Sequence, residues 1–264
     1  MNPRQHDGQH IRISGKQPVR EALLGGWPVR KIIIRGGPDD EFARDIAERA
    51  AALGVEVTVV PSQTFDRKYP RHTQGVVAHV AEVRLRDPDE VLKEVPPGEV
   101  PLFVALDGIL DPHNLGAITR TALALGVHAV VVPRHRSAAI GEGAVKSSAG
   151  AVFREPLCEV PNIHRFIEWA KGKGMWVFGL DAGGKENVWT VDLAGPVALV
   201  VGGEDKGLSR LARERCDAVV RIPMSGGIGS LNAGVACAVA VAEAARQRYQ
   251  KASQRAEKRS IDLR

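Results

Sequence analysis

The sequence predicts an α/β protein in which a small mixed α/β unit precedes a parallel sheet with helices on both faces. Continuous apolar runs recur after residue 100, and helical stretches separate them. A charged, proline-bearing segment ends in Pro96-Pro97-Gly98 and divides the chain. We therefore expect a disordered start over 1–10, an N-terminal unit over 11–82, a linker over 83–100, a C-terminal domain over 101–248 and a basic tail over 249–264.

The N-terminal unit contains three segments with strand character, 29–35, 55–60 and 75–83. A helix is expected between the first two, because Phe42, Ile46, Ala50 and Leu53 recur at helical spacing. Asp39 and Asp40 favour its start, and Gly54 ends it. The pattern predicts a small mixed sheet with helices.

The C-terminal domain contains five apolar runs, at 101–107, 127–133, 175–181, 196–201 and 218–223. Runs without alternation are typical of strands that are buried on both faces. Ligands of such parallel sheets bind where the chain leaves the carboxyl ends of strands. The segments that follow these strands are therefore the first place to look for a site.

Composition excludes several classes of protein. No apolar run reaches the ~20 residues of a membrane span, and the first ten residues lack a signal-peptide core, so we expect a cytosolic protein. The spacing of Cys158, Cys216 and Cys237 suggests neither zinc nor disulfides, and buried free thiols are expected. The net charge is +5, and the tail 251–264 supplies roughly +3 of it. Such a tail suits a phosphate backbone, although a solvated end of the chain explains it equally well.

The glycine-rich segment 202–209 superficially resembles a nucleotide-binding loop. Leu208 stands where a Walker A loop needs its lysine, and Lys206 lies on the wrong side of Gly207. Glu204 in the middle would repel phosphate, and the glycine order of a dinucleotide loop is missing. The sequence therefore argues against nucleoside triphosphate and NAD binding.

The helix after the first apolar run carries an isolated arginine. We expect Asn114 to cap this helix and Gly126 to end it. Arg120 is the only charged residue between Asn114 and Leu125, so it should be buried among apolar neighbours. A buried arginine needs a carboxylate or a phosphate, and an internal salt bridge is the alternative to a ligand.

Two further strand exits carry unusual polar residues. Glu204 follows an apolar strand, although an acid favoured by a helix dipole explains it as well. Glycines between Met224 and Gly229 allow close approach of the backbone to a ligand, and Ser230 could cap the helix that follows. Asn232 lies in an apolar helical pattern, where its amide needs a partner. Together these exits suit a cationic, adenosine-bearing cofactor and a nucleophile that must be oriented.

The same three segments strongly resemble the motifs of the SpoU (TrmH) family of RNA ribose 2'-O-methyltransferases, of the SPOUT class. Motif one resembles Asp111-Pro-His-Asn114-Leu-Gly116-Ala-Ile-Thr-Arg120-Thr-Ala. Motif two resembles Val200-Val-Gly202-Gly-Glu204-Asp-Lys-Gly207-Leu-Ser, and motif three Ile222-Pro-Met-Ser-Gly226 through Ser230-Leu231-Asn232-Ala. The match covers roughly residues 101–248, in the right order and without a departure.

The resemblance implies a homodimer, a deep trefoil knot in the C-terminal domain and S-adenosyl-L-methionine as cofactor, with no metal. The residues expected to hold the cofactor are Gly202, Gly203, Gly207, Ile222, Met224 and Leu231. The catalytic set is Arg120, Asn114, Glu204, Ser230 and Asn232. By similarity Arg120 contacts the target nucleotide, and we expect it to stabilise the forming alkoxide, because a guanidinium keeps its proton near neutral pH and is a poor general base. Asn114 and Asn232 would position the arginine and the ribose, Glu204 would orient the loop, and Ser230 would support the site.

The front segment resembles the substrate-binding domain of the branch that methylates a guanosine of 23S ribosomal RNA, typified by RlmB. The residues concerned are 13–23 and 74–78. Transfer RNA, an adenosine of 23S ribosomal RNA, and a non-catalytic RNA-binding role stay open as alternatives. The sequence also leaves open whether His113, Arg134 and Arg136 contact RNA.

Overall fold

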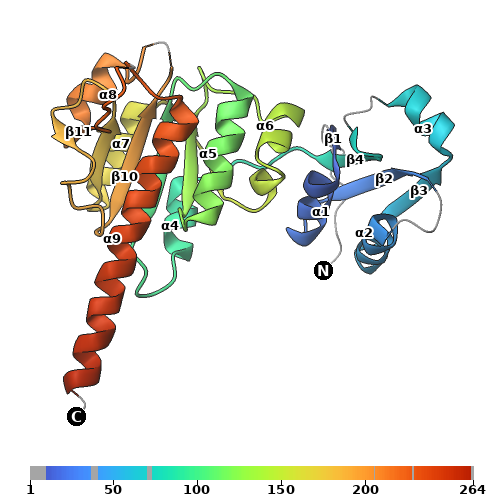
Figure 1. The fold of residues 1–264 in the computed structure, drawn as a ribbon, viewed down its shortest axis with the longest axis horizontal. Helices are drawn as coiled ribbons and strands as arrows, with labels where there is room; N and C mark the ends of the chain where they lie inside the picture. The colour runs from blue at the N-terminus through green and yellow to red at the C-terminus, as the bar shows by residue number, and fades with distance from the viewer. Residues whose placement is uncertain (1–9, 37–40, 70–72, 205, 228, 263–264) are drawn as a thin grey trace.

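The computed structural model describes residues 10–36, 41–69, 73–204, 206–227 and 229–262, with side chains as far as 254. It contains two sheets side by side, one of four strands and one of seven (Figure 1). The predicted disordered start falls almost wholly outside the described residues, as do Asp39 and Asp40.

The N-terminal sheet has the order β1-β4-β2-β3. Its strands are β1 (His10–Ser14), β2 (Val29–Arg35), β3 (Glu56–Val60) and β4 (Val76–Ala81), and its helices are α1 (Lys16–Leu24), α2 (Glu41–Ala52) and α3 (Ser62–Lys68). Strand β4 is antiparallel to β1 and β2, whereas β2 and β3 are parallel, which confirms the predicted mixed sheet. Within α2, Ile46 and Ala50 are buried as expected, but Leu53 lies beyond the helix and is exposed.

The C-terminal sheet is wholly parallel, in the order β7-β6-β5-β10-β8-β11-β9, which confirms the predicted fold class. Its strands are β5 (Leu102–Asp107), β6 (Ala129–Pro133), β7 (Leu157–Val160), β8 (Trp176–Leu180), β9 (Glu186–Asn187), β10 (Val197–Gly202) and β11 (Ala218–Arg221). Five of these seven strands fall on the five predicted apolar runs. The side chains of the central strands alternate between two buried clusters, one on each face.

Helices cover both faces of this sheet, as predicted. They are α4 (Pro88–Glu94), α5 (Pro112–Ala124), α6 (Glu142–Ser147), α7 (Ile163–Gly172), α8 (Arg210–Arg215) and α9 (Ala233–Asp262). Helices α5, α6 and α9 pack into one buried cluster, and α4, α7 and α8 pack into the other. The end of α9 extends well beyond the sheet (Figure 1). Among the described helices none combines the length and apolarity that crossing a bilayer requires.

Residues 83–100, the predicted linker, contain a helix and form backbone hydrogen bonds with the C-terminal domain. Asp87 caps α4 by accepting a hydrogen bond from the backbone N–H of Asp89, and Pro88 occupies the first turn. The backbone of Arg86 exchanges hydrogen bonds with Leu157 and Glu159, at 2.8 and 3.0 Å. This part of the segment is therefore packed against the C-terminal sheet.

The two units meet through a short 3-10 helix, Ala151–Phe153, and the start of α6. The rings of Trp27 and Phe153 lie 5.5 Å apart, centroid to centroid. Glu142 accepts a hydrogen bond from the Ser14 hydroxyl at 2.8 Å. These contacts fix the orientation of the N-terminal sheet relative to α6.

Arg248 attaches α9 to the amino ends of the strands. Its guanidinium donates hydrogen bonds to the carbonyl oxygens of Pro101 and Gly195, at 2.9 and 2.7 Å. Burial lowers the pKa of Arg248 to about 10. Carbonyl oxygens, rather than a carboxylate, therefore satisfy this cation.

Candidate active site

Three loops meet at the carboxyl edge of the sheet, after β5, β10 and β11. Strands β5 and β10 are hydrogen-bonded neighbours. Asp107, at the end of β5, accepts a hydrogen bond from the backbone N–H of Ser209 at 2.7 Å, and its carbonyl accepts one from Gly203 at 3.0 Å. A Cβ atom at Gly203 would lie only 2.6 Å from the carbonyl oxygen of Gly108, so only glycine allows these loops to approach so closely.

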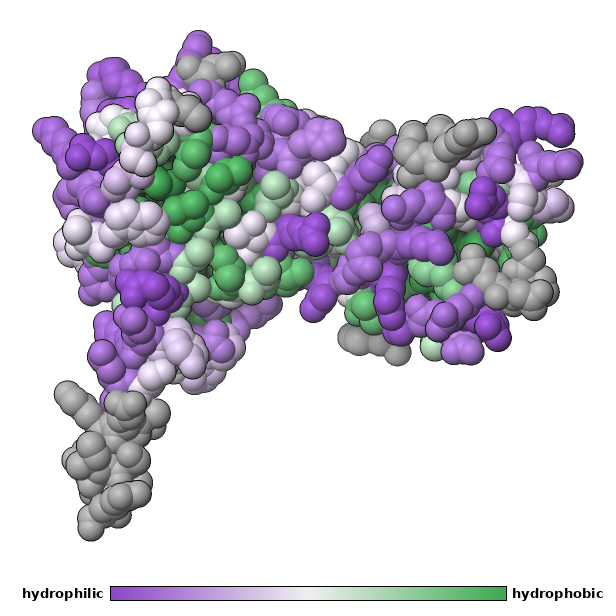
Figure 2. Space-filling model, in the orientation of Figure 1, coloured by the Kyte–Doolittle hydropathy of each residue, from purple (hydrophilic) through white to green (hydrophobic). Residues whose placement is uncertain are grey.

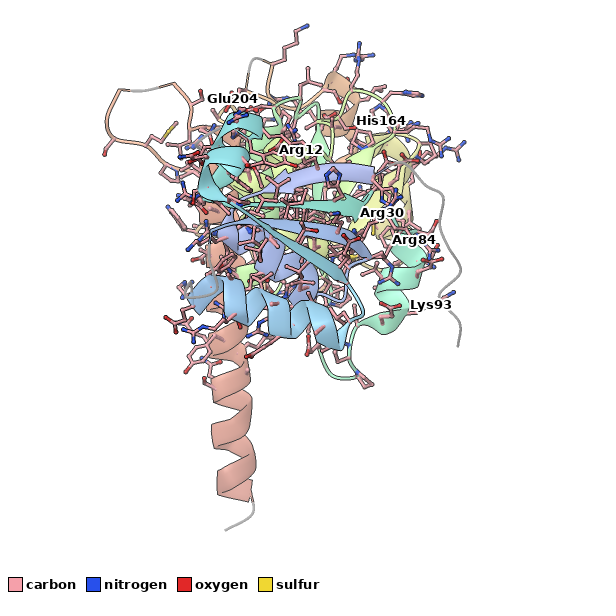
Figure 3. All side chains as sticks on the ribbon, turned by 90° about the vertical axis from the view of Figure 1, so that its right-hand side faces the viewer. Arg12, Arg30, Arg84, Lys93, His164 and Glu204 are labelled. Atoms are coloured by element: carbon pink, nitrogen blue, oxygen red, sulfur yellow. The ribbon has the colours of Figure 1, made fainter. Side chains whose placement is uncertain are left out.

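Asn114, Glu204 and Asn232 form a hydrogen-bonded cluster across these loops, which we call the amide–carboxylate triangle. Asn114 lies in α5, is 6% exposed, and donates to Glu204 Oε1 at 3.0 Å. Asn232 donates to Asn114 Oδ1 at 2.9 Å and also to Glu204 Oε1. Oε2 of Glu204 has no hydrogen-bond partner among the described residues, so it is free to accept one from a ligand. Figure 3 shows Glu204 at the end of the molecule where these loops lie.

The predicted capping residues are wrong in two helices. Asp111, not Asn114, caps α5 by accepting a hydrogen bond from the backbone N–H of His113 at 2.9 Å, and Pro112 follows it. Asn232 precedes α9 rather than lying inside it, and its Oδ1 accepts a hydrogen bond from the backbone N–H of Val235 at 3.2 Å. Ser230 is exposed and forms no hydrogen bond with a described residue, so it does not cap the helix.

Arg120 is not buried, contrary to the prediction. It lies on the exposed face of α5 together with His113, Ala117 and Ala124. This guanidinium forms no ion pair or hydrogen bond with any residue in the described part of the chain. The internal salt bridge is therefore excluded for these residues, and Arg120 forms no hydrogen bond with the triangle.

A pocket of about 290 Å³ lies beside the triangle. Its lining includes all six residues predicted to hold the cofactor, namely Gly202, Gly203, Gly207, Ile222, Met224 and Leu231. Glu204 and Ser230 also line it, whereas Asn114, Asn232 and Arg120 do not. The structure thus brings together the loops of motifs two and three around one cavity.

Asp181 and Arg213 line the same pocket, and neither is among the site residues predicted from the sequence. Arg213 lies 2.6 Å from the Asp181 carboxylate. Burial raises the pKa of Asp181, but the backbone N–H groups of Gly183 and Leu208 and the Arg213 guanidinium outweigh it, so the pKa lies below its usual range. Asp181 directly follows β8, so the rule about strand ends had already marked its position.

The pocket suits S-adenosylmethionine in its polar and apolar groups. The backbone N–H and C=O groups of the described residues in 222–231 form no hydrogen bond with a described residue, so they are free to recognise an adenine edge. Ile222 and Leu231 supply apolar surface for a ring. Asp181, Glu204, Lys206 and Arg213 offer both signs of charge to a zwitterionic amino-acid group. No cluster of metal-binding side chains occurs among the described residues.

Two family models match the chain. The SpoU rRNA methylase family matches residues 101–242, which include the pocket and the triangle. A model described as RNA 2'-O ribose methyltransferase substrate binding matches residues 12–85, which cover the N-terminal sheet. The two matches together cover most of the chain.

Individual relatives match over nearly the whole length. A protein of Mycolicibacterium vanbaalenii named an uncharacterized tRNA/rRNA methyltransferase is 42% identical over 93% of this chain and 81% of its own. The SpoU methyltransferase AviRb of Streptomyces viridochromogenes, crystallised with AdoMet, is 30% identical with a TM-score of 0.77, covering 91% of both chains. An AdoMet-bound rRNA methyltransferase of Sinorhizobium meliloti is 28% identical with a TM-score of 0.73, covering 90% of this chain and 87% of its own.

Proposed function

Because the chain belongs to the SpoU rRNA methylase family of RNA methyltransferases, we propose that it methylates a ribose 2'-hydroxyl group, and that this ribose is in a guanosine of 23S ribosomal RNA. The observation that carries the proposal is the amide–carboxylate triangle at the edge of a glycine-lined pocket. Asn114 comes from motif one, Glu204 from motif two and Asn232 from motif three, so the triangle joins all three motifs.

The cofactor is S-adenosylmethionine, in keeping with solved relatives that hold it. When bound, it supplies an electrophilic methyl group. We assign its binding to the pocket residues Gly202, Gly203, Gly207, Ile222, Met224 and Leu231. The balance of charges around Asp181 and Arg213 would orient its amino-acid end.

The amide–carboxylate triangle holds the Glu204 carboxylate in position, and Arg120 is not part of it. Two amide groups hold Oε1, so Oε2 is presented with little freedom to an incoming hydroxyl group. Arg120 acts on the nucleotide from the exposed face of α5, where it stabilises negative charge on the 2'-oxygen and binds a phosphate. Ser230 lines the pocket and supports the binding of its occupant.

The N-terminal unit favours ribosomal RNA as substrate. Residues 12–85 match a substrate-binding model, and the Sinorhizobium relative, which covers 90% of this chain, is named an rRNA methyltransferase. Transfer RNA and an adenosine of 23S ribosomal RNA are the alternatives for the same chemistry. RNA of all these kinds is recognised by shape and by unstacked bases, so the test must compare them directly.

The active form is a homodimer in this proposal. Leu110 is 65% and Val235 50% exposed, on the loop before α5 and the first turn of α9. Figure 2 shows hydrophobic residues gathered over α5 and the first half of α9, while the visible face of the N-terminal unit is mostly hydrophilic. A second copy would cover this apolar surface. A cytoplasmic location and the trefoil knot belong to the same proposal.

The experiment that tests the proposed function is methyl transfer from labelled S-adenosylmethionine to unmodified transcripts of 23S ribosomal RNA and of transfer RNA. We expect label in the 23S transcript, at a ribose of guanosine after nuclease digestion. Equilibrium binding of the labelled cofactor separates the enzyme from a non-catalytic RNA-binding protein of the same fold. Cofactor binding without transfer to any RNA would refute the catalytic proposal.

A further inference from the structure

One face of the N-terminal sheet is largely uncovered. Helices α1 and α2 pack against the face that carries Ile32 and Ile34. On the other face, α3 covers the end near Val77, through Phe65 and Tyr69, and α6 covers the neighbouring Ser14, which is buried and donates to Glu142. The rest of that face is open to solvent or half-buried.

The open face carries cations in adjacent strands. Arg12 of β1 pairs in register with His79 of β4, and His79 pairs with Lys31 of β2. Paired residues on neighbouring strands project to the same side of a sheet, so these three side chains form one row. Strands lie about 4.8 Å apart, so the row spans roughly 10 Å, enough to meet more than one phosphate.

An irregularity in β2 lies beside this row and contains a further cation that acts on His79. The register with β4 shifts between Val29 and Lys31, which leaves Arg30 as an extra residue opposite β4. Such irregularities redirect a side chain from its normal alternation. Arg30 is exposed and has no hydrogen bond or ion pair among the described residues.

His79 reports the charge of this surface. Its pKa lies below its usual value, first because it is partly buried, and then because Arg12, His10, Arg30 and Lys68 act on it. These four groups are all basic, and they come from three elements, β1, β2 and α3. The open face therefore concentrates positive potential around its centre.

Acidic residues neutralise only part of this charge. Glu56 lies 2.7 Å from Lys31, and Glu142 lies 3.9 Å from Arg12. Arg30 and Lys68 have no acidic partner among the described residues, and Lys68 lies over the Tyr69 ring. Positive charge therefore remains available to an anion.

We propose that this open face binds the phosphate backbone of the RNA whose ribose enters the pocket. The residues of this cationic sheet face are His10, Arg12, Arg30, Lys31, Lys68 and His79. The proposal rests on the proposed function for the identity of the ligand. A polyanion such as RNA complements this positive charge. Each phosphate that the face neutralises releases counterions, which adds to the affinity.

The cationic sheet face and the pocket lie on the same side of the molecule. In Figure 1, α3 lies on the upper side of the N-terminal sheet, and α9 begins at the upper end of the C-terminal sheet, next to the pocket loops. Figure 3 shows Arg12 and Glu204 toward that same upper side. One RNA molecule can therefore contact both without wrapping around the protein.

A continuous set of contacts fixes the cationic sheet face relative to the pocket. Ser14 of β1 bonds to Glu142 of α6. Helix α6 packs tightly on α5, where a Cβ atom at Gly116 would lie less than 3 Å from three atoms of α6 and the residue after it. Helix α5 carries Asn114, so a phosphate held at β1 is held at a defined distance from the triangle.

The test compares the double variant Arg30→Glu with Lys68→Glu against a matched control, Arg44→Glu with Lys93→Glu. All four residues are exposed, and both pairs change the net charge equally. Arg44 lies on α2, on the covered side of the sheet, and Lys93 lies on α4. Binding to an unmodified 23S ribosomal RNA transcript is measured at several salt concentrations, alongside cofactor binding and the unfolding temperature.

We expect the sheet-face variant to lose about tenfold or more in RNA affinity, with the salt slope reduced by about two, since two phosphate contacts are removed. Its cofactor affinity and its turnover at saturating RNA should equal those of the wild type. The control variant should bind RNA within about twofold of the wild type.

Equal losses in the two variants would refute the proposal, because they would reflect net charge alone. A wild type without affinity for RNA would refute it as well. A wild type that binds RNA through this face but transfers no methyl group would refute the proposed function and leave the sheet-face proposal standing.

Discussion

Arg120 forms no hydrogen bond or ion pair with a residue in the described part of the chain. Its guanidinium therefore adds nothing to the stability of the fold. Its exposed position on α5 leaves its donors available to a ligand. By contrast, the amides of Asn114 and Asn232 are already bonded to Glu204. At the residue scale, the site therefore holds the Glu204 carboxylate in place and leaves the Arg120 guanidinium available to a ligand.

Replacement of Arg120 tests whether its guanidinium acts on the substrate without contributing to cofactor binding or to stability. Arg120→Ala should lower turnover by about 100-fold, the usual cost of losing one group that stabilises a developing oxyanion. Cofactor affinity should stay unchanged, and the free energy of unfolding should change by less than about 0.5 kcal/mol, because the side chain is exposed and unpaired. Single-turnover kinetics, cofactor titration and chemical unfolding measure the three quantities.

Arg120→Lys completes that comparison. A retained rate whose pH profile moves toward a lysine pKa would show that this position abstracts the proton, which contradicts the role assigned here. An equal loss of cofactor binding in Arg120→Ala would contradict it too.

Asn232 and Ser230 form a second matched pair. Asn232→Ala removes the bonds to Asn114 and Glu204 and the hydrogen bond to the Val235 N–H, so we expect a loss of about 1–2 kcal/mol in stability. Turnover should fall with it, since Glu204 keeps only one of its two amide donors. Ser230→Ala should leave stability unchanged, and an equal loss of stability in both variants would show that the triangle does not stabilise the loop.

Glu155 makes stability depend on pH. It is 4% exposed, Oε1 has no partner, and burial raises its pKa from 4.5 to about 8. A raised carboxyl pKa favours the folded state fully below pH 4.5, and this contribution is lost as pH rises toward 8. At pH 7 the cost is about 3 kcal/mol.

Glu155→Gln should therefore unfold at a higher temperature than the wild type at pH 8 and at nearly the same temperature at pH 4.5. Calorimetry at the two pH values measures the difference. A constant difference between the two proteins across this range would mean that Glu155 is ionised in the folded state.

At the element scale, α5 depends on close packing against α6. A Cβ atom at Gly116 would lie 2.6 Å from the Ala144 carbonyl oxygen and 2.8 Å from the Ser148 nitrogen. Both of these atoms belong to the backbone and cannot rotate away. A glycine inside a helix normally weakens it, so the close crossing explains its presence here.

Gly116→Ala should consequently destabilise the protein by about 3 kcal/mol or more, the upper range for overpacking. Gly172→Ala is the control, since nothing lies within 4 Å of its added Cβ at the end of α7. The control should be neutral or slightly stabilising. Denaturant unfolding measures the free energy of unfolding of both variants. A Gly116→Ala variant as stable as the wild type would show that α5 and α6 can move apart without loss of stability.

The elements of the C-terminal sheet could be predicted where burial on both faces leaves an uninterrupted apolar run. Strand β7 has only four residues and β9 two, too short for such a signal. Helix α4 lies within the predicted linker, because its charged, proline-bearing composition is also typical of linkers, although Asp87 and Pro88 form a standard helix start. The start of α5 was misplaced for the same reason, since Asp111 and Pro112 precede Asn114.

The candidate site could be predicted only in part. The positions of Glu204 and of the pocket loops could be predicted, because the carboxyl ends of parallel strands all lie at one edge of the sheet. The apolar sequence around Arg120 suggested burial, but three of its helical neighbours, His113, Ala117 and Ala124, leave one face exposed. Which amides meet which carboxylate depends on the crossing of α5 and α9, and no local pattern records it.

At the scale of the whole molecule, the two sheets are held together by small, specific contacts. The Trp27 ring packs at a tilt against Phe153, and Arg154 lies 3.1 Å from Glu21. These contacts set the position of the cationic sheet face relative to the pocket. Under the proposed function, the choice of RNA depends on both units, whereas the proposed cofactor site is formed by the C-terminal loops.

The most direct test of the central claim is to map 2'-O-methyl groups on ribosomal RNA from cells with this protein, without it, and with Arg120→Ala in its place. The account predicts one guanosine of 23S ribosomal RNA that carries the methyl group only with the wild type. Unchanged maps in all three strains, or a lost methyl group on a base instead of a ribose, would contradict it.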